Sequence, residues 1–257
     1  MWQTVAMATT VGIRARVRAE LIQEIKDQAR RQVADAGASA LSLRAVARDL
    51  GMVSSAIYRY FPSRDQLLTA LIIDAYDAIG GAAEAADAAC ERTDFLRRWR
   101  AVCHAVRAWA LEHPHEYALV YGSPVPGYTA PQDTVGPASR VTLALAAVVS
   151  DAAAAGTLHG PFTAEHFPTL SKRAAAEASR AGSIALPGVP ADAVVRALTS
   201  WTQLFGYLSF DLFGHLEGVI EDRDALFDQN VTDMAAYIGI PLEPSRRQGV
   251  RSTKATQ

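Results

Sequence analysis

The sequence predicts an all-α protein, with a small N-terminal helical domain followed by a larger one. Alanine is abundant along the whole chain, and apolar residues recur at spacings of three and four. Runs of alternating β-branched residues are hard to find. Half of the 257 residues are hydrophobic, so a real core is expected and a chain disordered throughout is excluded. We expect domains at 1–80 and 81–240, and a disordered tail at 241–257.

Composition indicates the cellular compartment and excludes several classes of protein. The formal net charge is −2, and Cys90 and Cys103 are too few for a disulfide scaffold. No apolar stretch reaches the ~18 residues that a transmembrane helix needs, and the N-terminus lacks the pattern of a signal peptide. We therefore expect a cytoplasmic protein with no membrane partner and no cofactor.

Charge is divided unevenly along the chain. Residues 1–64 hold ten Lys/Arg and five Asp/Glu, whereas residues 65–257 hold fifteen and twenty-two. A basic head on an acidic body suggests that only the head meets a polyanion, although chance clustering would also give this asymmetry.

Helix signals follow one another through the head. A helix over 17–36 is predicted by one apolar face, and Gly37 is a plausible stop. Ser42 is the expected N-cap of a helix over 43–50, which Gly51 ends. A brief helix over 54–61 stops at Pro62, and a capping box at 63–66 opens a helix that runs to Gly80-Gly81. That glycine pair is interpreted as the domain junction.

The body continues in the same style. Helices are expected near 82–90, 94–112, 115–122, 137–155, 168–181, 190–216 and 222–238. Loops rich in Gly and Pro separate them, with the longest at 122–136, 156–161 and 182–190.

Residues 43–61 carry the functional motif. Two short helices that cross steeply need a small residue where they touch and a left-handed residue in the turn, and these are Ala47 and Gly51. Such a pair is a helix-turn-helix, which inserts its second helix into the DNA major groove. An ordinary αα-hairpin is the alternative. Exposed polar residues on the second helix and the local positive charge favour the helix-turn-helix.

The run from Leu41 to Leu68 resembles the DNA-binding domain of the tetracycline-repressor (TetR) family. The match is long, has no gap and covers about residues 15–70. It rests on residues at the family's spacing: Ala47, Gly51, Ile57, Tyr58, Tyr60, Phe61, Ser63, Arg64, Leu67 and Leu68.

The resemblance implies which side chains meet DNA. Phosphate contacts are expected from Ser42, Arg44, Tyr58 and Arg64. Base edges are expected to be read by Ser54, Ser55, Ala56, Arg59 and Tyr60, with Arg59 meeting either guanine or phosphate. The family usually has a hydroxyl cap where this chain has Val53. Because valine cannot cap, Ser54 or Ser55 is expected to do so, and the helix start to shift.

Two further basic segments have open roles. Arg14, Arg16 and Arg18 are expected to precede the first helix, either as an arm that reaches DNA or as a solvated, frayed end. The basic tail with Arg246, Arg247, Arg251 and Lys254 is interpreted as solubilising.

The C-terminal part resembles, more weakly, the Trp-His-Gly type of TetR ligand-binding domain. The matching stretches are 108–117, 201–206 and 213–215, and Phe205 stands where that type has histidine. The resemblance implies a pocket for a small effector between the helices at 94–112, 115–122, 137–155 and 190–216. Mostly apolar walls with scattered polar tips suit a hydrophobic or aromatic effector.

Candidate ligand-binding residues come from these helices, although many of them would equally serve as plain core. They are Trp99, Cys103, Val106, Trp109, Tyr117, Val120, Tyr121, Trp201, Leu204, Phe205, Tyr207 and Leu208. The 122–136 loop is a candidate mouth of the pocket, and the 182–190 loop is a second candidate for a movable segment.

The helices at 190–216 and 222–238 are expected to form a homodimer, as the last two helices do in the family. The predicted contact stripes are Val194, Leu198, Trp201, Leu204 and Leu208 on one helix, and Leu226, Val231, Met234 and Ile238 on the other. A two-fold dimer places its recognition helices about one DNA turn, ~35 Å, apart, so the DNA operator should be palindromic.

The expected function is a repressor that an effector releases from its operator. An activator with the same head is an alternative that sequence does not separate. A helical enzyme or metal site is a second rival, since Cys103, His104, Glu112, His113, His115 and Glu116 lie close in sequence. No helical zinc-binding signature, nucleophile elbow or phosphate loop accompanies them, so no catalytic residue and no metal ligand is predicted.

Overall fold

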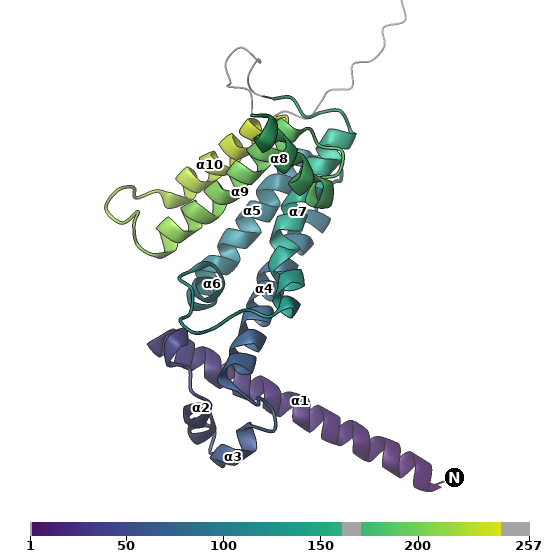
Figure 1. The fold of residues 1–257 in the computed structure, drawn as a ribbon, viewed down its shortest axis with the longest axis vertical. Coiled ribbons are helices and arrows are strands. Elements are labelled where there is room, and N and C mark those ends of the chain that lie inside the picture. The colour runs from purple at the N-terminus through teal and green to yellow at the C-terminus, as the bar shows by residue number, and fades with distance from the viewer. Residues whose placement is uncertain (1, 161–170, 243–257) are drawn as a thin grey trace, which may run out of the picture. The chain divides into compact units, whose positions relative to one another are not determined.

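The computed structural model describes residues 2–160 and 171–242, and the side chains from residue 13 onward. Every regular element in these ranges is helical, which confirms the all-α class (Figure 1). The α-helices are α1 (Trp2–Ala36), α2 (Leu43–Asp49), α3 (Ser54–Ile57), α4 (Arg64–Ala88), α5 (Phe95–Glu112), α6 (Pro114–Tyr121), α7 (Val135–Ala154), α8 (Lys172–Ala185), α9 (Ala191–Leu212) and α10 (Arg223–Ile238). Short 3₁₀ turns lie at Ala38–Ala40 and Gln132–Thr134.

The helices form two compact units. The first unit contains residues up to Ala82 together with Val106–Val141, and the second contains Ala83–Ala105 and the chain from Thr142 on. Helices α4, α5 and α7 contribute to both units. Neither unit holds, within its described part, a helix long and apolar enough to cross a bilayer.

One long helix replaces the two that were predicted around Gly80 and Gly81. Helix α4 continues through both glycines to Ala88, so the expected break at this pair is wrong. The glycines serve close packing instead of a turn. A Cβ built on Gly80 would lie 2.6 Å from Cβ of Arg140, where α7 crosses α4. Arg140 Nη1 donates to the main-chain oxygen of Asp77 at 3.0 Å across the same crossing.

Two other boundaries differ from the predictions. Helix α1 begins at Trp2, so Arg14, Arg16 and Arg18 lie within it and do not precede it. The 182–190 segment is helical to Ala185, because Gly182 lets α8 approach Val194 of α9. The tail from 243 on and the start of the helix expected at 168–181 lie outside the described residues.

The core of the first unit lies between α1, α2, α3 and α4. The predicted apolar face of α1 supplies Ile25, Ala29 and Val33, all buried. Val125 and Tyr128, from the loop after α6, pack on the same core. The Tyr128 hydroxyl is 2.8 Å from Oγ1 of Thr69, which ties this loop to α4.

A buried arginine organises the second unit. Arg98 of α5 has no exposed side-chain surface, and its Nε donates to Asp87 Oδ1 of α4 at 2.7 Å. Its Nη1 lies 2.8 Å from Asp151 Oδ2 of α7 and donates to the main-chain oxygen of Arg92 at 3.0 Å. A charge taken out of water in this way needs its partners.

We expect Asp87→Asn to lower the free energy of unfolding by about 3 kcal/mol. This loss of free energy is at the low end of the range for a broken buried ion pair, because Asp151 still lies beside the Arg98 guanidinium. Chemical denaturation followed by circular dichroism measures the change. Asp77→Asn is the matched control, since Asp77 is 49% exposed in its pair with Arg140 and should cost at most ~1 kcal/mol. Equal losses in the two variants would contradict the structural role of Arg98.

Candidate nucleic-acid interface

Helices α2 and α3 are joined by a tight, well-capped turn. Oγ of Ser42 accepts a hydrogen bond from the Ala45 amide at 3.4 Å, so Ser42 caps α2 as predicted. Gly51 has φ +67°, the left-handed conformation that the turn requires. The Met52 amide donates to Ala47 O at 2.8 Å, and the Gly51 amide donates to Arg48 O at 3.0 Å. These two bonds form the glycine-terminated helix end called a Schellman motif.

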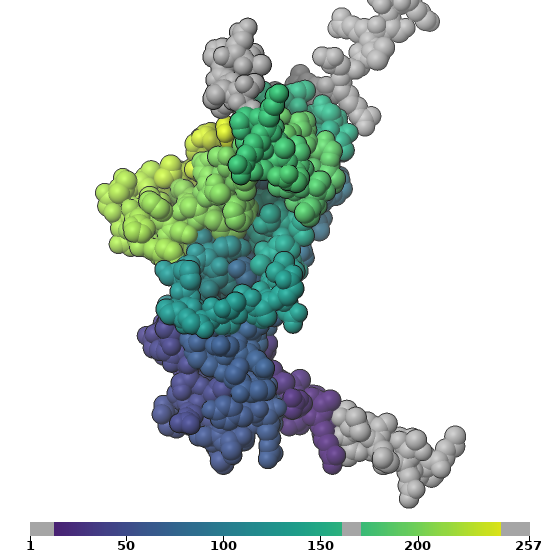
Figure 2. Space-filling model, in the orientation of Figure 1, coloured from purple at the N-terminus to yellow at the C-terminus, as the bar shows by residue number. Residues whose placement is uncertain are grey.

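Burial of one face of the motif leaves the other face to solvent. Val46, Ala47 and Ile57 have no exposed surface and hold α2 and α3 against the core of the first unit. The segment lies at the surface of that unit (Figure 2). The predicted DNA-contacting residues lie on its outer side. Five of them are exposed: Arg44, Ser54, Ser55, Tyr58 and Arg59. The other four are half-buried: Ser42, Ala56, Tyr60 and Arg64.

The second helix of the motif is shorter than predicted. Regular α-helix covers Ser54–Ile57, and residues 58–60 form a turn in which the Arg59 amide donates to Ala56 O at 3.1 Å. Val53 occupies the N-cap position and makes no side-chain cap. The expected shift to a serine cap is therefore wrong. The helix begins with the main-chain hydrogen bond from the Ala56 amide to Val53 O at 2.8 Å, without a side-chain cap.

The arginines of the motif have different surroundings. Arg64 Nη2 donates to Ala38 O at 2.8 Å, and Nη1 donates to Asp65 Oδ1 at 3.2 Å. The start of α4 is further fixed by the Gln66 amide, which donates to Oγ of Ser63 at 3.2 Å. Arg44 and Arg59 are exposed and form no side-chain ion pair with the described residues. They are thus the arginines most available to an anionic partner.

Helix α1 also reaches the motif. The guanidinium of Arg18 lies 5.1 Å from the ring centroid of Tyr60, and its Nη2 is 3.5 Å from Arg59 O. Arg18 therefore supports the end of the turn after α3 by a cation–π contact.

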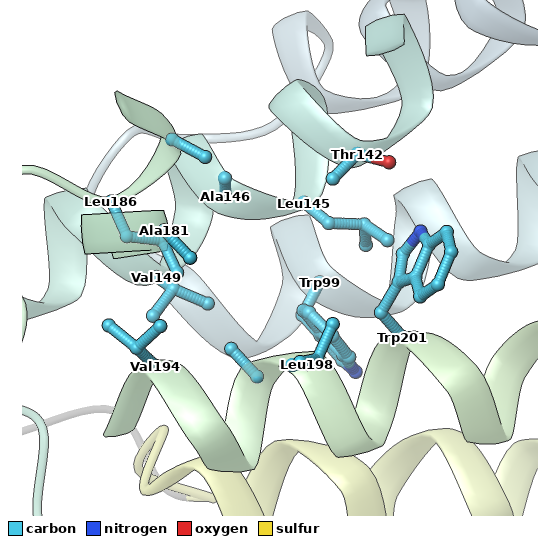
Figure 3. Close-up of a pocket in the computed structure, with 12 residues that line it drawn as sticks. Trp99, Thr142, Leu145, Ala146, Val149, Ala181, Leu186, Val194, Leu198 and Trp201 are labelled. Atoms are coloured by element: carbon cyan, nitrogen blue, oxygen red, sulfur yellow. The ribbon is translucent and has the colours of Figure 1, made fainter. Parts of the chain in front are cut away.

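The second unit contains an apolar cavity of about 250 Å³ (Figure 3). Its walls come from α5, α7, α8 and α9, and Thr142 supplies the only hydroxyl among its lining residues. The lining residues are Trp99, Thr142, Leu145, Ala146, Val149, Ala181, Ala185, Leu186, Val194, Ala197, Leu198 and Trp201.

Of the twelve predicted ligand-binding residues, Trp99 and Trp201 line this cavity. Sequence reasoning missed the α7 face at 142, 145, 146 and 149, although its helical spacing was available as a signal. Five of the predicted residues belong to the first unit: Val106, Trp109, Tyr117, Val120 and Tyr121. The others lie elsewhere in the second unit, with Cys103, Leu204 and Leu208 fully buried in its core.

A wider groove of about 570 Å³ lies in the first unit, where Val120 and the 122–136 loop line it together with Ile72 and Tyr76. Two of its hydroxyl groups are already engaged by main-chain oxygens. Tyr76 donates to Val120 O at 3.1 Å, and Thr134 donates to Pro131 O at 2.7 Å. Burial raises the pKa of Tyr76 and of Tyr121 beside it.

Comparison with known proteins identifies the family. Residues 25–71 match the family model of bacterial regulatory proteins of the tetR family, and residues 99–234 match the tetracycline-repressor-like C-terminal domain. The HTH-type transcriptional regulator Rv1816 of Mycobacterium tuberculosis (strain H37Rv) is 37% identical over 234 residues, which is 89% of this chain and 96% of that protein. The chain belongs to the TetR family.

Solved structures share this fold. The crystal structure of the protein SCO4313 matches this chain with a TM-score of 0.68 and 37% sequence identity. The match covers 86% of this chain and 98% of the SCO4313 chain. PfmR, a TetR family regulator from Thermus thermophilus, shares the fold with a TM-score of 0.51 at 15% identity, over 85% of this chain and 98% of its own. The protein is a DNA-binding transcriptional regulator. The C-terminal match does not establish the Trp-His-Gly type.

The predicted dimer stripes of this TetR protein are largely internal. Val194, Leu204 and Leu208 are buried within the chain, so they belong to its core and cannot form a free contact surface. The same correction applies to Val231, Met234 and Ile238 of α10. Leu198 of the predicted stripe is an exception, because it stays 57% exposed. Phe210 (56%) and Phe213 (46%), near and just after the end of α9, are exposed large apolar residues as well.

The residues considered for catalysis or metal binding are divided between the two units. His113 and His115 lie in the first unit, whereas Cys103 and His104 lie in the second. His104 Nε2 is 3.1 Å from Asp228 Oδ1 beside the Arg100–Asp228 ion pair. Complete burial raises the pKa of the Cys103 thiol, which keeps it protonated and poorly nucleophilic. Within the described residues, no three His, Cys, Asp or Glu side chains gather as a metal site.

Proposed function

We propose that this TetR regulator is a cytoplasmic homodimeric repressor that leaves a palindromic operator when a small apolar molecule fills its second unit. The observation that carries the proposal is the pairing of two features. A capped helix-turn-helix exposes Arg44 and Arg59, which form no ion pair with the described residues, and an apolar cavity lies among α5, α7, α8 and α9.

DNA contacts divide by the surroundings of each residue. Arg44 and the Tyr58 hydroxyl are exposed and suit phosphates, as does Ser42 at the start of α2. Ser54, Ser55, Ala56 and Tyr60 suit base edges, and Arg59 suits a guanine or a phosphate. Arg64 contributes chiefly by fixing the start of α4, since its guanidinium is bonded to Ala38 O. That helix N-terminus would then meet phosphate.

Dimerisation is proposed through the outer side of α9 and α10. Leu198, Phe210 and Phe213 expose apolar surface that a second copy would cover. Gly206 lies on the same side of α9, and nothing lies within 4 Å of a Cβ built there. A small residue with open space above it suits the close approach of a partner helix.

Effector binding would reach the head through α6. Trp99 on α5 lines the cavity, and α5 ends where α6 begins at Pro114. In the first unit, Glu116 Oε1 of α6 lies 3.1 Å from Nε of Arg30 on α1. Displacing α5 would therefore pull on α1 through this pair, and on α4 through Tyr76. The effector acts only by its difference in affinity for the two states.

Glu116→Gln tests this relay. It removes the α1–α6 ion pair but leaves Arg30 bonded to Asp74 at 2.6 Å. The affinity of the ligand-free variant for DNA should stay within about threefold of wild type, as an order-of-magnitude expectation. The effector-dependent loss of DNA affinity should change by ~0.5–2 kcal/mol. Unchanged coupling, measured by anisotropy with and without effector, would place the relay elsewhere.

The proposal as a whole is tested by DNA binding. Purified protein is titrated onto the DNA upstream of its own gene at several salt concentrations, followed by fluorescence anisotropy. Saturable binding by one or two dimers per duplex, with a steep salt dependence, is expected. No binding by ligand-free protein, either there or to a selected palindrome, would contradict it. Operator position relative to the promoter then separates repressor from activator.

A further inference from the structure

The two tryptophans of the cavity differ in what their indole nitrogens do. Nε1 of Trp99 donates to the main-chain oxygen of Val231 on α10 at 3.1 Å, so its hydrogen bond is satisfied within the protein. Nε1 of Trp201 is buried and has no hydrogen-bond partner among the described residues. In Figure 3 the Trp201 nitrogen is on the ring edge turned toward Leu145 and Thr142, whereas that of Trp99 is turned away from them.

A buried donor without a partner is unusual in a folded protein. Most buried polar groups are hydrogen-bonded, and each exception needs an explanation. Ser150 Oγ, Ser200 Oγ and Asn230 Oδ1 also have no partner among the described residues, but of these four residues Trp201 alone lines the cavity. An indole N–H is only a donor, so the missing partner must be an acceptor. Nε1 itself is covered, so an acceptor reaches it only when a molecule in the cavity displaces the side chains over the nitrogen. Because the cavity is lined by apolar side chains and one hydroxyl, a molecule that suits it is otherwise apolar.

Charge and size limit the ligand further. None of the lining residues is basic or acidic, so a carboxylate or an ammonium group would enter without a counter-charge. At about 250 Å³ the cavity is at the small end of ligand sites. Both features select a small neutral molecule.

We propose that Trp201 is the polar anchor of the effector site, and that its Nε1 donates to a carbonyl or ether oxygen of a small, neutral, otherwise apolar ligand. The proposal rests on the proposed role of this cavity as the effector site. The test measures ligand binding directly, without DNA. A failure of this proposal can therefore be distinguished from a failure of operator binding.

Three probes of the same shape separate the contributions. They are 2-acetylnaphthalene, which has a carbonyl, 2-isopropenylnaphthalene, in which a methylene group replaces the carbonyl oxygen, and 2-naphthoate, which is charged. Calorimetric titration of the full-length protein should give about tenfold tighter binding of the ketone than of the hydrocarbon, the ordinary contribution of one neutral hydrogen bond. The carboxylate should bind ~100-fold more weakly than the ketone.

Two matched variants test the anchor itself. Trp201→Phe should abolish the preference for the ketone and lower the melting temperature less than Trp99→Phe does, because the N–H that it removes has no partner in the empty protein. Trp99→Phe should keep the preference and lower the melting temperature, because it breaks the bond to Val231. Ala146→Leu, which fills the cavity from α7, should abolish binding of both neutral probes and so assign the binding to this cavity.

Several results would overturn the proposal. Equal affinity for ketone and hydrocarbon in wild type would do so, as would a ketone preference that survives in Trp201→Phe. Failure of all three probes to bind the folded protein would also count against it. Dissociation of the dimer by Trp201→Phe, seen in sedimentation, would assign the N–H to the subunit interface instead.

Discussion

Replacing Arg44 and Arg59 together by alanine is expected to abolish operator binding at physiological salt. Both side chains are exposed and unpaired among the described residues, so their removal takes away contacts without disturbing the head. A dimer loses four arginines. At ~1 kcal/mol for each contact, affinity should fall by about 10³-fold. The slope of log affinity against log salt should shrink by ~0.9 for each phosphate contact that is lost.

The matched control removes the same charge from the second unit. Arg173→Ala with Arg180→Ala changes two exposed arginines of α8. This variant should bind the operator within a few-fold of wild type, because it leaves every predicted DNA contact of the α2–α3 face in place. If both double variants lost affinity equally, binding would depend on overall charge. The role of the α2–α3 face would then be rejected.

Gly206→Glu is expected to convert the dimer into monomers. The substitution meets no atom within 4 Å in the chain itself and replaces a residue that is unfavourable in helices, so the fold should persist. In a two-fold interface it places two carboxylates against apolar surface from Leu198 and Phe210. A buried unpaired charge costs several kcal/mol, so the dimer dissociation constant should rise at least ~100-fold.

Sedimentation equilibrium and circular dichroism together measure this effect. Gly136→Glu is the control, since Gly136 is also an exposed helical glycine with nothing within 4 Å of a built Cβ. It should remain dimeric. The Gly206 variant should also bind operator far more weakly, because a monomer makes about half of the phosphate contacts. A helical, dimeric Gly206→Glu protein would move the interface away from this side of α9.

Local signals in the sequence were sufficient to predict the helix-turn-helix. Ser42, Ala47 and Gly51 act within a few residues of one another, through a cap, a close contact and a left-handed turn. Their positions in the structure agree with the prediction because each role is set by main-chain geometry. The same reasoning predicted most of the later helices to within a few residues.

Errors arose where a residue serves a distant partner. Gly80 resembled a helix break, yet it is small because Arg140 of α7 packs on it. Val194 and Val231 formed apolar stripes that suited an interface, yet both are buried within the chain. Periodicity says that a helix face is apolar, but it does not say whether the chain itself or a second copy covers that face.

By itself, the sequence determined the helical class, the DNA-binding motif and the family resemblance, since these depend on short-range spacing. Only the tertiary structure decided which tryptophans share a cavity and which side of α9 stays open. It also decided that the indole N–H of Trp99 has a hydrogen-bond partner among the described residues and that of Trp201 has none. These properties depend on contacts between α5, α7, α8, α9 and α10, which are far apart along the chain. Burial and hydrogen-bond satisfaction arise only when such segments pack together.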